Sequence, residues 1–291
     1  MKKIVILGCE NSHADIFLGF MKGNENYADL QVAGVYSDDK TAAEKLAEKY
    51  GVKVMSAYDE SEGRVDGVIV TARHGNNHYK YAAPYIKTGV PMFIDKPVSI
   101  AEADALKLAR ECKAAGVRLT GGSTCVHDER VQTLKNEHDN NKDGKTISGF
   151  IRCPINLKNN YGDFFFYSEH LVGIMSTIFG YYPESVKAYK NAEKITVVFR
   201  YKDYDVTGLY VDKNNLYYAM RIAENGVHGE ELPINELNPC FKMEFNSFYG
   251  LLCGEKQRLS YEDFIAPVFV LNAIQRSLDS GNEEKINKFE V

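Results

Sequence analysis

Residues 2–13 read KKIVILGCENSH, and this stretch decides the fold. Residues 2–7 combine isoleucine, valine and leucine in the pattern of a buried strand. Gly8 ends that strand, and Ser12-x-x-Asp15 has the spacing of a capping box at the start of a helix. The apolar side chains behind it recur at helical spacing: Ile16, Phe17, Phe20 and Met21. A strand that runs through a glycine turn into a helix is the opening of a βαβ unit.

The same alternation of strand and helix continues to about residue 122. Further strands are predicted over 30–36, 65–71, 91–95 and 117–120. Helical patterns lie between them and end at glycines: 41–51, 77–89 and 99–116. Because short connections between such elements form right-handed crossovers, the strands must be parallel. We therefore expect residues 1–122 to form a Rossmann-like α/β domain with a parallel sheet.

Residues 123–291 show a different pattern, in which strands alternate apolar and polar side chains. The expected strands are 147–155, 185–189, 195–201, 204–211 and 216–223, with a helix over 168–179. Two helical segments close the chain, one around Phe245 and one after Ser260 that Pro267 is expected to interrupt. We expect a substrate and oligomerisation domain of the α+β class, with a large, open and mostly antiparallel sheet.

Composition narrows the classes of function. Among 291 residues, 40 Asp and Glu outnumber 35 Lys and Arg, so the net charge is −5. An acidic chain lacks the basic surface that would attract nucleic acids or anionic membranes, and we expect neither as a partner. No apolar run approaches a membrane span, and residues 1–8 are expected to be a first strand and not a signal peptide. Six cysteines without a C-x-x-C pair favour free thiols in a reducing compartment, the cytoplasm.

The turn Gly8-Cys9-Glu10-Asn11-Ser12-His13 stands where a dinucleotide-binding domain holds its glycine fingerprint. Three glycines there let the backbone approach a pyrophosphate at the helix N-terminus. Only Gly8 is present, and Glu10 places negative charge near the anion. A plain βα turn with a capped helix therefore remains open as the other interpretation.

The second strand ends in Tyr36-Ser37-Asp38-Asp39, a position that decides between NAD and NADP. A carboxylate there binds the ribose hydroxyls of NAD, whereas an arginine accommodates the phosphate of NADP. Since no Arg or Lys occurs between Tyr36 and Lys40, NAD is the expected cofactor and NADP the less favoured one. The alternative is that Asp38 and Asp39 only start the next helix, where acids favour the dipole.

Further polar side chains follow the ends of other strands. Lys96, which precedes Pro97, stands at the end of the fourth strand. Its ammonium group could polarise a substrate oxygen there, and the alternative is an ordinary solvated lysine on the surface. His74 and His78 follow the third strand and can crowd the same edge as His13. Two histidines four residues apart can bind one metal ion when both lie on the same helix. His74 is predicted to lie in a Gly/Asn loop and not on the helix of His78, so no metal is expected.

In the second half, Glu169-His170 opens the predicted helix over 168–179. His170 lies at the edge of the buried face, near the positive end of the helix dipole, which favours the neutral imidazole. A neutral histidine in that place can act as a base on an alcohol. A histidine that only packs at a helix start is the other interpretation.

Taken in order, these segments resemble the glucose–fructose oxidoreductase/inositol dehydrogenase (Gfo/Idh/MocA) family over nearly the whole chain. Thr71 and His78 match its threonine-to-histidine segment at the end of a central strand. Residues 89–97 (GVPMFIDKP) match its Glu-Lys-Pro signature, with Asp in place of Glu. The segment from His170 to residue 188 matches its second-domain helix and returning strand, and residues 245–281 match its C-terminal helices.

The resemblance implies a Rossmann domain followed by an α/β domain with a large open sheet. It implies NAD or NADP as cofactor and hydride transfer to or from a sugar, cyclitol or related polyol. By the same resemblance, Lys96 contacts substrate and nicotinamide, and His170 exchanges the hydroxyl proton. Residues 9–13 and 71–78 would contact cofactor or substrate.

The chain departs from the family pattern at four places. Phe166 and Gly173 stand where the family has Asp, Cys125 lies near its usual Arg, and the fingerprint keeps only Gly8. A lost acid–base partner can cost ~10²–10⁴ in rate. The residues that could replace it are Asp163, Tyr167 and Glu169. Two other functions stay open: a non-catalytic nucleotide- or ligand-sensing member of the same fold, and a metal-assisted hydrolase or isomerase.

Several strands of the second half carry side chains that we expect on the open face of the sheet: Tyr189, Val197, Phe199, Tyr201, Tyr210 and Tyr218. A monomer rarely leaves such a patch exposed, and closed pairs are the commonest oligomers. We therefore expect a homodimer or a dimer of dimers.

Overall fold

The computed structural model describes residues 1–233 and 238–291, which form two compact units. The first unit comprises Met1–Gly122, Phe241–Phe264 and Val291, and the second comprises Ser123–Cys240 and Ile265–Glu290. Each unit has its own hydrophobic core. The expected domains, 1–122 and 123–291, follow the order of the sequence, whereas the segment Phe241–Phe264 lies with the first unit.

The first unit contains one five-stranded parallel sheet with the order β2-β1-β3-β4-β5. Its strands are β1 (Lys2–Leu7), β2 (Leu30–Tyr36), β3 (Gly67–Val70), β4 (Met92–Asp95) and β5 (Leu119–Gly122). The helices that alternate with them are α1 (Ser12–Met21), α2 (Lys40–Tyr50), α3 (Asn76–Ile86) and α4 (Glu102–Ala115). A short 3₁₀ turn, η1 (Glu25–Tyr27), precedes β2. The predicted Rossmann-like parallel sheet is confirmed.

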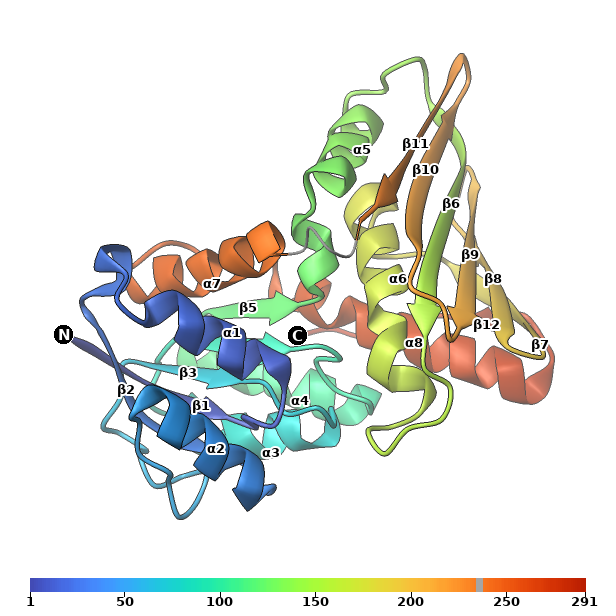
Figure 1. Ribbon diagram of the computed structural model, residues 1–291. Helices are drawn as coiled ribbons and strands as arrows, with labels where there is room; N and C mark the ends of the chain where they lie inside the picture. The colour runs from blue at the N-terminus through green and yellow to red at the C-terminus, as the bar shows by residue number, and fades with distance from the viewer. Residues whose placement is uncertain (234–237) are drawn as a thin grey trace. The chain divides into compact units, whose positions relative to one another are not determined.

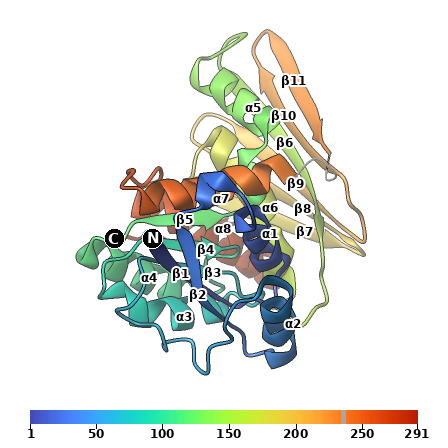
Figure 2. The ribbon, with the colours of Figure 1, turned by 60° about the vertical axis from the view of Figure 1, so that its left-hand side comes forward.

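Helices cover both faces of this sheet. Figures 1 and 2 show α1 and α7 (Asn238–Leu252) over one face and α3 and α4 over the other. The last four residues of β1 are fully buried, as expected for a central parallel strand covered on both sides. Phe17 of α1 lies with its ring centroid 5.2 Å from that of Phe93 in β4 and 5.2 Å from that of Phe245 in α7.

An aromatic face explains why α7 packs in the first unit. Phe245 and Phe248 are fully buried, and a Cβ added to Gly67 of β3 would lie 2.6 Å from Leu252 and 3.0 Å from Phe248. Burial of these rings on the first sheet supplies the driving force for this placement. Position along the chain does not reveal it, because α7 follows the strands of the second unit.

The second unit is built on a seven-stranded sheet with the order β11-β10-β6-β9-β8-β7-β12. Its strands are β6 (Thr146–Ile155), β7 (Ser185–Asn191), β8 (Lys194–Arg200), β9 (Asp205–Asp212), β10 (Tyr217–Ala223), β11 (Gly226–Leu232) and β12 (Glu284–Lys285). Neighbouring strands pair antiparallel except β6 and β9, which are parallel. The expected α+β unit with a large, mostly antiparallel sheet is confirmed.

One face of this sheet is covered by α6 (Phe164–Phe179) and α8 (Tyr261–Ser280), as Figure 1 shows. Val197, Phe199 and Tyr210 are fully buried in the core, so their expected place on an open face is wrong. The register explains the error, because Val197 pairs with Gly208, and a Cβ on Gly208 would meet Leu171 of α6. Tyr201 also packs against the core.

The other face carries cross-strand rows of side chains, all of them half-buried except the exposed Tyr189. One row runs across four strands: Val198, Thr207, Phe150 and Met220. A second row runs across five: Tyr189, Thr196, Leu209, Arg152 and Tyr218. Of the expected aromatic set, Tyr189 and Tyr218 lie on this face, and Tyr189 is 56% exposed.

Some elements differ from the expectation. The 3₁₀ turn η2 (Thr124–His127), helix α5 (Glu129–Asp139) and strand β11 have no counterpart among the expected elements. Helix α8 continues through Pro267, so the expected interruption is wrong. Ile265, Ala266 and Val268 around the proline are buried, and this packing outweighs one lost backbone hydrogen bond.

All six cysteines are free thiols; five are buried and Cys253 is exposed. Burial raises the pKa of the Cys9 thiol to about 12, so this side chain of the turn stays protonated. Over residues 1–233 and 238–291, no helix combines the length and apolarity that a membrane crossing requires.

Candidate functional site

The turn after β1 is held tightly against the end of β3. Gly8 has φ +80°, and a Cβ at this position would lie 2.3 Å from Cα of Ala72. Thr71 is fully buried, and its hydroxyl donates a hydrogen bond of 3.1 Å to the carbonyl oxygen of Gly8. Only glycine accepts this backbone conformation and this close contact without strain. The predicted residues of both segments therefore meet at the carboxyl edge of the first sheet.

Glu10 connects three strand ends at that edge. Its Oε2 accepts a hydrogen bond of 2.6 Å from the Ser37 hydroxyl, which follows β2. Its Oε1 accepts a hydrogen bond of 3.0 Å from the backbone N–H of Arg73, which follows β3. Because β1 lies between β2 and β3 in the sheet, one carboxylate spans all three strand ends.

The two acids after β2 play different parts. Asp39 Oδ1 accepts a hydrogen bond from the N–H of Ala42, so Asp39 caps the N-terminus of α2. This agrees with the alternative interpretation, in which the acids after the second strand start the next helix. Asp38 instead accepts a hydrogen bond of 2.8 Å from the Tyr36 hydroxyl. Partial burial acts to raise the pKa of Asp38, but hydrogen bonds from neighbouring tyrosines and the Lys80 ammonium hold it below its usual range. Asp38 is thus an anchored carboxylate at the end of β2.

A buried polar cluster lies behind the turn. Asn11 donates a hydrogen bond of 2.8 Å from Nδ2 to Oδ2 of Asp95, at the end of β4. His13 lies between two carboxylates: its Nδ1 is 3.3 Å from Asp95, and its Nε2 is 3.6 Å from Glu244 of α7. Asp95 and Glu244 are fully buried and His13 is 5% exposed. The cluster joins α1, β4 and α7 through polar contacts.

Burial shifts the titration of this cluster. It raises the pKa of Asp95 to about 6, even though His13 and Lys96 act in the opposite direction. Burial also lowers the pKa of His13, against the attraction of Asp95. The cluster can therefore take up or release a proton near neutral pH, which is a property common at functional sites.

Lys96 follows Asp95 directly and is 5% exposed, so it is not the solvated surface lysine of the alternative interpretation. Its backbone N–H donates a hydrogen bond of 2.7 Å to Oδ1 of Asp95, and the Lys96–Pro97 peptide bond is cis. The ammonium group opposes protonation of His13 and His78. Lys96 is thus a buried cation at the edge where the predicted residues meet.

The remaining residues near this edge have structural contacts. His78 is fully buried and its Nε2 lies 2.7 Å from the carbonyl oxygen of Ala72. His74 Nδ1 accepts a hydrogen bond from the N–H of Asn76 at the start of α3. Ser12 is exposed and its hydroxyl lies 3.3 Å from Oδ1 of Asn11. Within the described residues, no three His, Cys, Asp or Glu side chains are arranged to hold a metal ion.

His170 belongs to the second unit, in the second turn of α6. Its Nδ1 lies 2.8 Å from the Ser123 hydroxyl oxygen and 3.6 Å from the Cys125 sulfur, both just beyond β5. The ring is 7% exposed and packs edge-on against Tyr167, with centroids 5.4 Å apart. Phe166, at the place of the family aspartate, packs against the rings of Tyr161 and Tyr167 in tilted and edge-on contacts. Nδ1 of the imidazole therefore lies within hydrogen-bond distance of a hydroxyl group.

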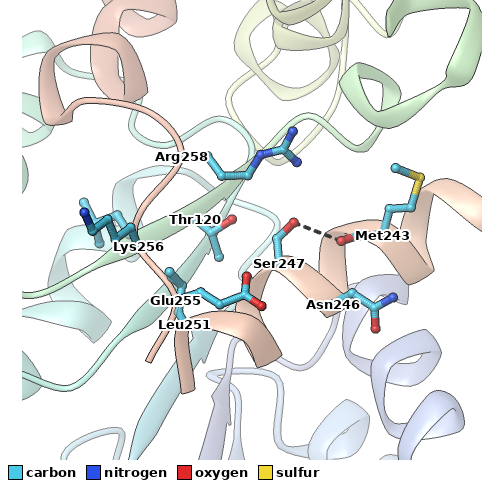
Figure 3. A pocket seen from close by; sticks show the side chains of 9 residues that line it. Thr120, Met243, Asn246, Ser247, Leu251, Glu255, Lys256 and Arg258 are labelled. Atoms are coloured by element: carbon cyan, nitrogen blue, oxygen red, sulfur yellow. Dashed lines mark hydrogen bonds between the residues drawn. The ribbon is translucent and has the colours of Figure 1, made fainter. Parts of the chain in front are cut away.

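Two pockets lie apart from all these residues. One of about 410 Å³ is formed by β5, α7 and the segment after α7. Figure 3 shows Arg258 and Ser247 among its lining side chains, with the Ser247 hydroxyl donating to the carbonyl oxygen of Met243. The other, of about 380 Å³, lies between α5 and β11. No predicted site residue lines either pocket.

Two features of the first unit suit a bound dinucleotide: the backbone of the turn after β1 and one carboxylate after β2. Gly8 provides the tight turn, and α1 begins without a side-chain cap, which leaves its first N–H groups to an anion. These N–H groups would hold the pyrophosphate of a bound dinucleotide, and Asp38 would hold ribose hydroxyls. Glu10 is the exception, because its carboxylate lies where the fingerprint has a glycine.

Sequence reasoning missed Glu244 and Ser123 as members of these clusters. Glu244 had a signal, since an acid between Phe241 and Phe245 falls on the apolar face of its helix. Ser123 had none, because 47 positions separate it from His170 and only the fold brings them together.

Two of three comparisons with known proteins give a match. Residues 2–123 match the profile of an oxidoreductase family with an NAD-binding Rossmann fold, Gfo/Idh/MocA. A comparison with curated protein sequences gives no match.

Solved structures of dehydrogenases match over nearly the whole length of the chain. A putative myo-inositol dehydrogenase from Sinorhizobium meliloti has a TM-score of 0.83 and 15% identity, covering 99% of this chain and 100% of the other. Myo-inositol 2-dehydrogenase from Lactobacillus plantarum has a TM-score of 0.84 and 15% identity, covering 98% and 99%. Scyllo-inositol dehydrogenase from Lactobacillus casei, with bound NAD(H) and scyllo-inositol, has a TM-score of 0.83 and 13% identity, covering 98% and 99%. Residues 2–123 thus match the Gfo/Idh/MocA oxidoreductase family, and the chain as a whole has the fold of these dehydrogenases.

Proposed function

We propose that the chain is an NAD-dependent oxidoreductase that transfers a hydride to or from a CH–OH group of a sugar, cyclitol or related polyol. The observation that carries the proposal is Lys96. A buried ammonium at the carboxyl edge of a parallel sheet, inside the segment that matches an NAD-binding family, is costly to keep without a use. Relatives of the same fold act on inositols, which supports a polyol as substrate.

Oxidation of an alcohol needs a base for the hydroxyl proton and a cation for the oxygen as charge develops. When bound, NAD supplies the acceptor for the hydride. We assign the base to His170 and the cation to Lys96. In this assignment, Nδ1–H of His170 donates to the Ser123 hydroxyl oxygen, and Nε2 carries the lone pair that accepts the proton. Ser123 is then a positioning residue: it orients the His170 ring, the role that an aspartate at the place of Phe166 would have.

A turnover assay tests the proposal. Purified protein is incubated with NAD and a panel of inositols, sugars and sugar acids, and NADH absorbance is followed. We expect one member of the panel to produce NADH, and Lys96→Ala and His170→Ala to abolish its formation while NAD binding persists. Lys45→Ala, at an exposed position of α2, is the matched control and should retain full activity.

A non-catalytic sensing protein of the same fold is the second candidate. Phe166 favours it, because an aromatic ring at that place cannot exchange a proton. Ligand-dependent stabilisation by NAD and by a polyol, without NADH formation from any panel member, would support this candidate and contradict the first. A bound ligand at ~100 times its Kd adds ~2.7 kcal/mol to the free energy of unfolding, so thermal shifts detect it.

We also propose that two copies pair through the open face of the second sheet, as a dimer or a dimer of dimers. The rows through Phe150 and Leu209 form a continuous, partly apolar surface with Tyr189 at 56% exposure. A second copy of the same face is the occupant that closes such a surface by two-fold symmetry. The cytoplasm is the compartment we propose, since none of the cysteines forms a disulfide.

A further inference from the structure

Glu10 occupies the second position of the fingerprint, where dinucleotide-binding turns have glycine so that the backbone can approach the pyrophosphate. In this chain the position carries a carboxylate that already has two hydrogen-bond donors. The Ser37 hydroxyl donates to one oxygen at 2.6 Å, and the N–H of Arg73 donates to the other at 3.0 Å. A negatively charged group of the protein is thus bound in the way that a ligand anion would be.

Ser37 has only one hydroxyl proton to give. Its oxygen accepts a hydrogen bond from the N–H of Asp39, and its proton points to Glu10. Ser37 is 4% exposed and stands directly after β2, the place where NAD and NADP are told apart. The donor that could have recognised a 2′-phosphate is therefore engaged within the protein.

We propose that Glu10 is a built-in competitor of the dinucleotide, which keeps its affinity low and discriminates most strongly against NADP. The inference rests on the proposed function, because it assumes that this edge binds a dinucleotide. For the pyrophosphate to approach α1, the Glu10 side chain must leave the turn or remain beside a like charge. Either course weakens binding, and a 2′-phosphate near Ser37 meets the same carboxylate in addition to Asp38.

Binding measurements on three variants test this role without any need for turnover. Kd values for NAD and NADP are measured by calorimetry on the wild type, Glu10→Gln and Glu10→Gly. Glu10→Gln removes the charge at nearly constant shape, and Glu10→Gly restores the fingerprint glycine. The matched control is Glu44→Gln, an exposed acid of α2 that changes the net charge equally. Circular dichroism and thermal unfolding verify that each variant is folded.

We expect both Glu10 variants to bind NAD ~10-fold more tightly than the wild type, the effect of removing one like charge in contact with a phosphate. The gain for NADP should be larger, and Glu44→Gln should bind like the wild type. Unchanged or weaker NAD binding by folded Glu10 variants overturns the inference while the proposed function stands. A gain for NAD without a larger gain for NADP overturns the discrimination. If no variant binds either dinucleotide, the proposed function fails together with the inference.

Discussion

Replacement of Gly8 by alanine probes the contact on which the candidate site is built. The Cβ of alanine would lie 2.3 Å from Cα and from N of Ala72. Both are backbone atoms, so a flexible side chain cannot move aside. The turn after β1 and the end of β3 would have to separate, and the hydrogen bond from Thr71 to the Gly8 carbonyl would break.

The expected cost has two parts. A non-glycine residue at φ +80° costs about 1–2 kcal/mol, and the forced separation of two packed segments costs about 1–3 kcal/mol more. Gly23 is the matched control, because it has φ +69° in the same unit and no atom within 4 Å of an added Cβ. Gly23→Ala should show only the backbone part. Gly8→Ala should therefore lower the free energy of unfolding by about 1–3 kcal/mol more than Gly23→Ala.

Urea unfolding followed by circular dichroism measures both variants against the wild type. Gly8→Ala should in addition weaken NAD binding, since the turn that faces the pyrophosphate is displaced, whereas Gly23→Ala should not. Equal destabilisation by the two substitutions would refute the reasoning, because it would show that the turn and β3 do not need their close contact.

Three further predictions follow from other contacts. Burial raises the pKa of Asp95 to about 6, so the stability that its protonated form contributes is present below pH ~4 and is lost as the pH rises through ~6. Over this window, the free energy of unfolding of the wild type should fall by about 1–3 kcal/mol relative to that of Asp95→Asn. An equal pH dependence of the two proteins would contradict this prediction. In ¹⁵N NMR spectra, the proton of neutral His170 should reside on Nδ1, and Ser123→Ala should shift it toward Nε2; an unchanged tautomer would remove Ser123 from its positioning role. Phe150→Asp should produce a monomer in light scattering, while Met243→Asp, at an exposed apolar position of α7 in the first unit, should leave the oligomer intact. A monomeric wild type would contradict the proposed pairing.

The sequence predicted the first sheet well because its information is local. The β-branched run 2–7, the glycine turn and the regular alternation of strands and helices each act over a few residues. For the same reason, the turn residues 8–13, Ser37, Thr71 and Lys96 could be assigned to one edge, since parallel strands end on the same side.

The rest of the site depends on contacts between distant segments. Helix α7 packs by its aromatic face on a sheet more than a hundred residues earlier, so Glu244 next to His13 could not be foreseen from spacing. The aromatic strands of the second unit alternate correctly, but alternation alone does not tell which face α6 and α8 cover. Val197 and Phe199 were therefore assigned to the wrong side. The bond between Glu10 and Ser37 likewise requires two turns to meet.

Isotope transfer tests the central claim most directly. The substrate found in the polyol panel is prepared with deuterium on its CH–OH carbon, mixed with the protein and NAD for one turnover, and the nicotinamide product is examined by mass spectrometry. Hydride transfer predicts one deuterium in NADH with the wild type and with Lys45→Ala, and none with Lys96→Ala or His170→Ala. Formation of the oxidised product without deuterium in NADH, or deuterium in NADH from both site variants at the wild-type rate, would contradict the account.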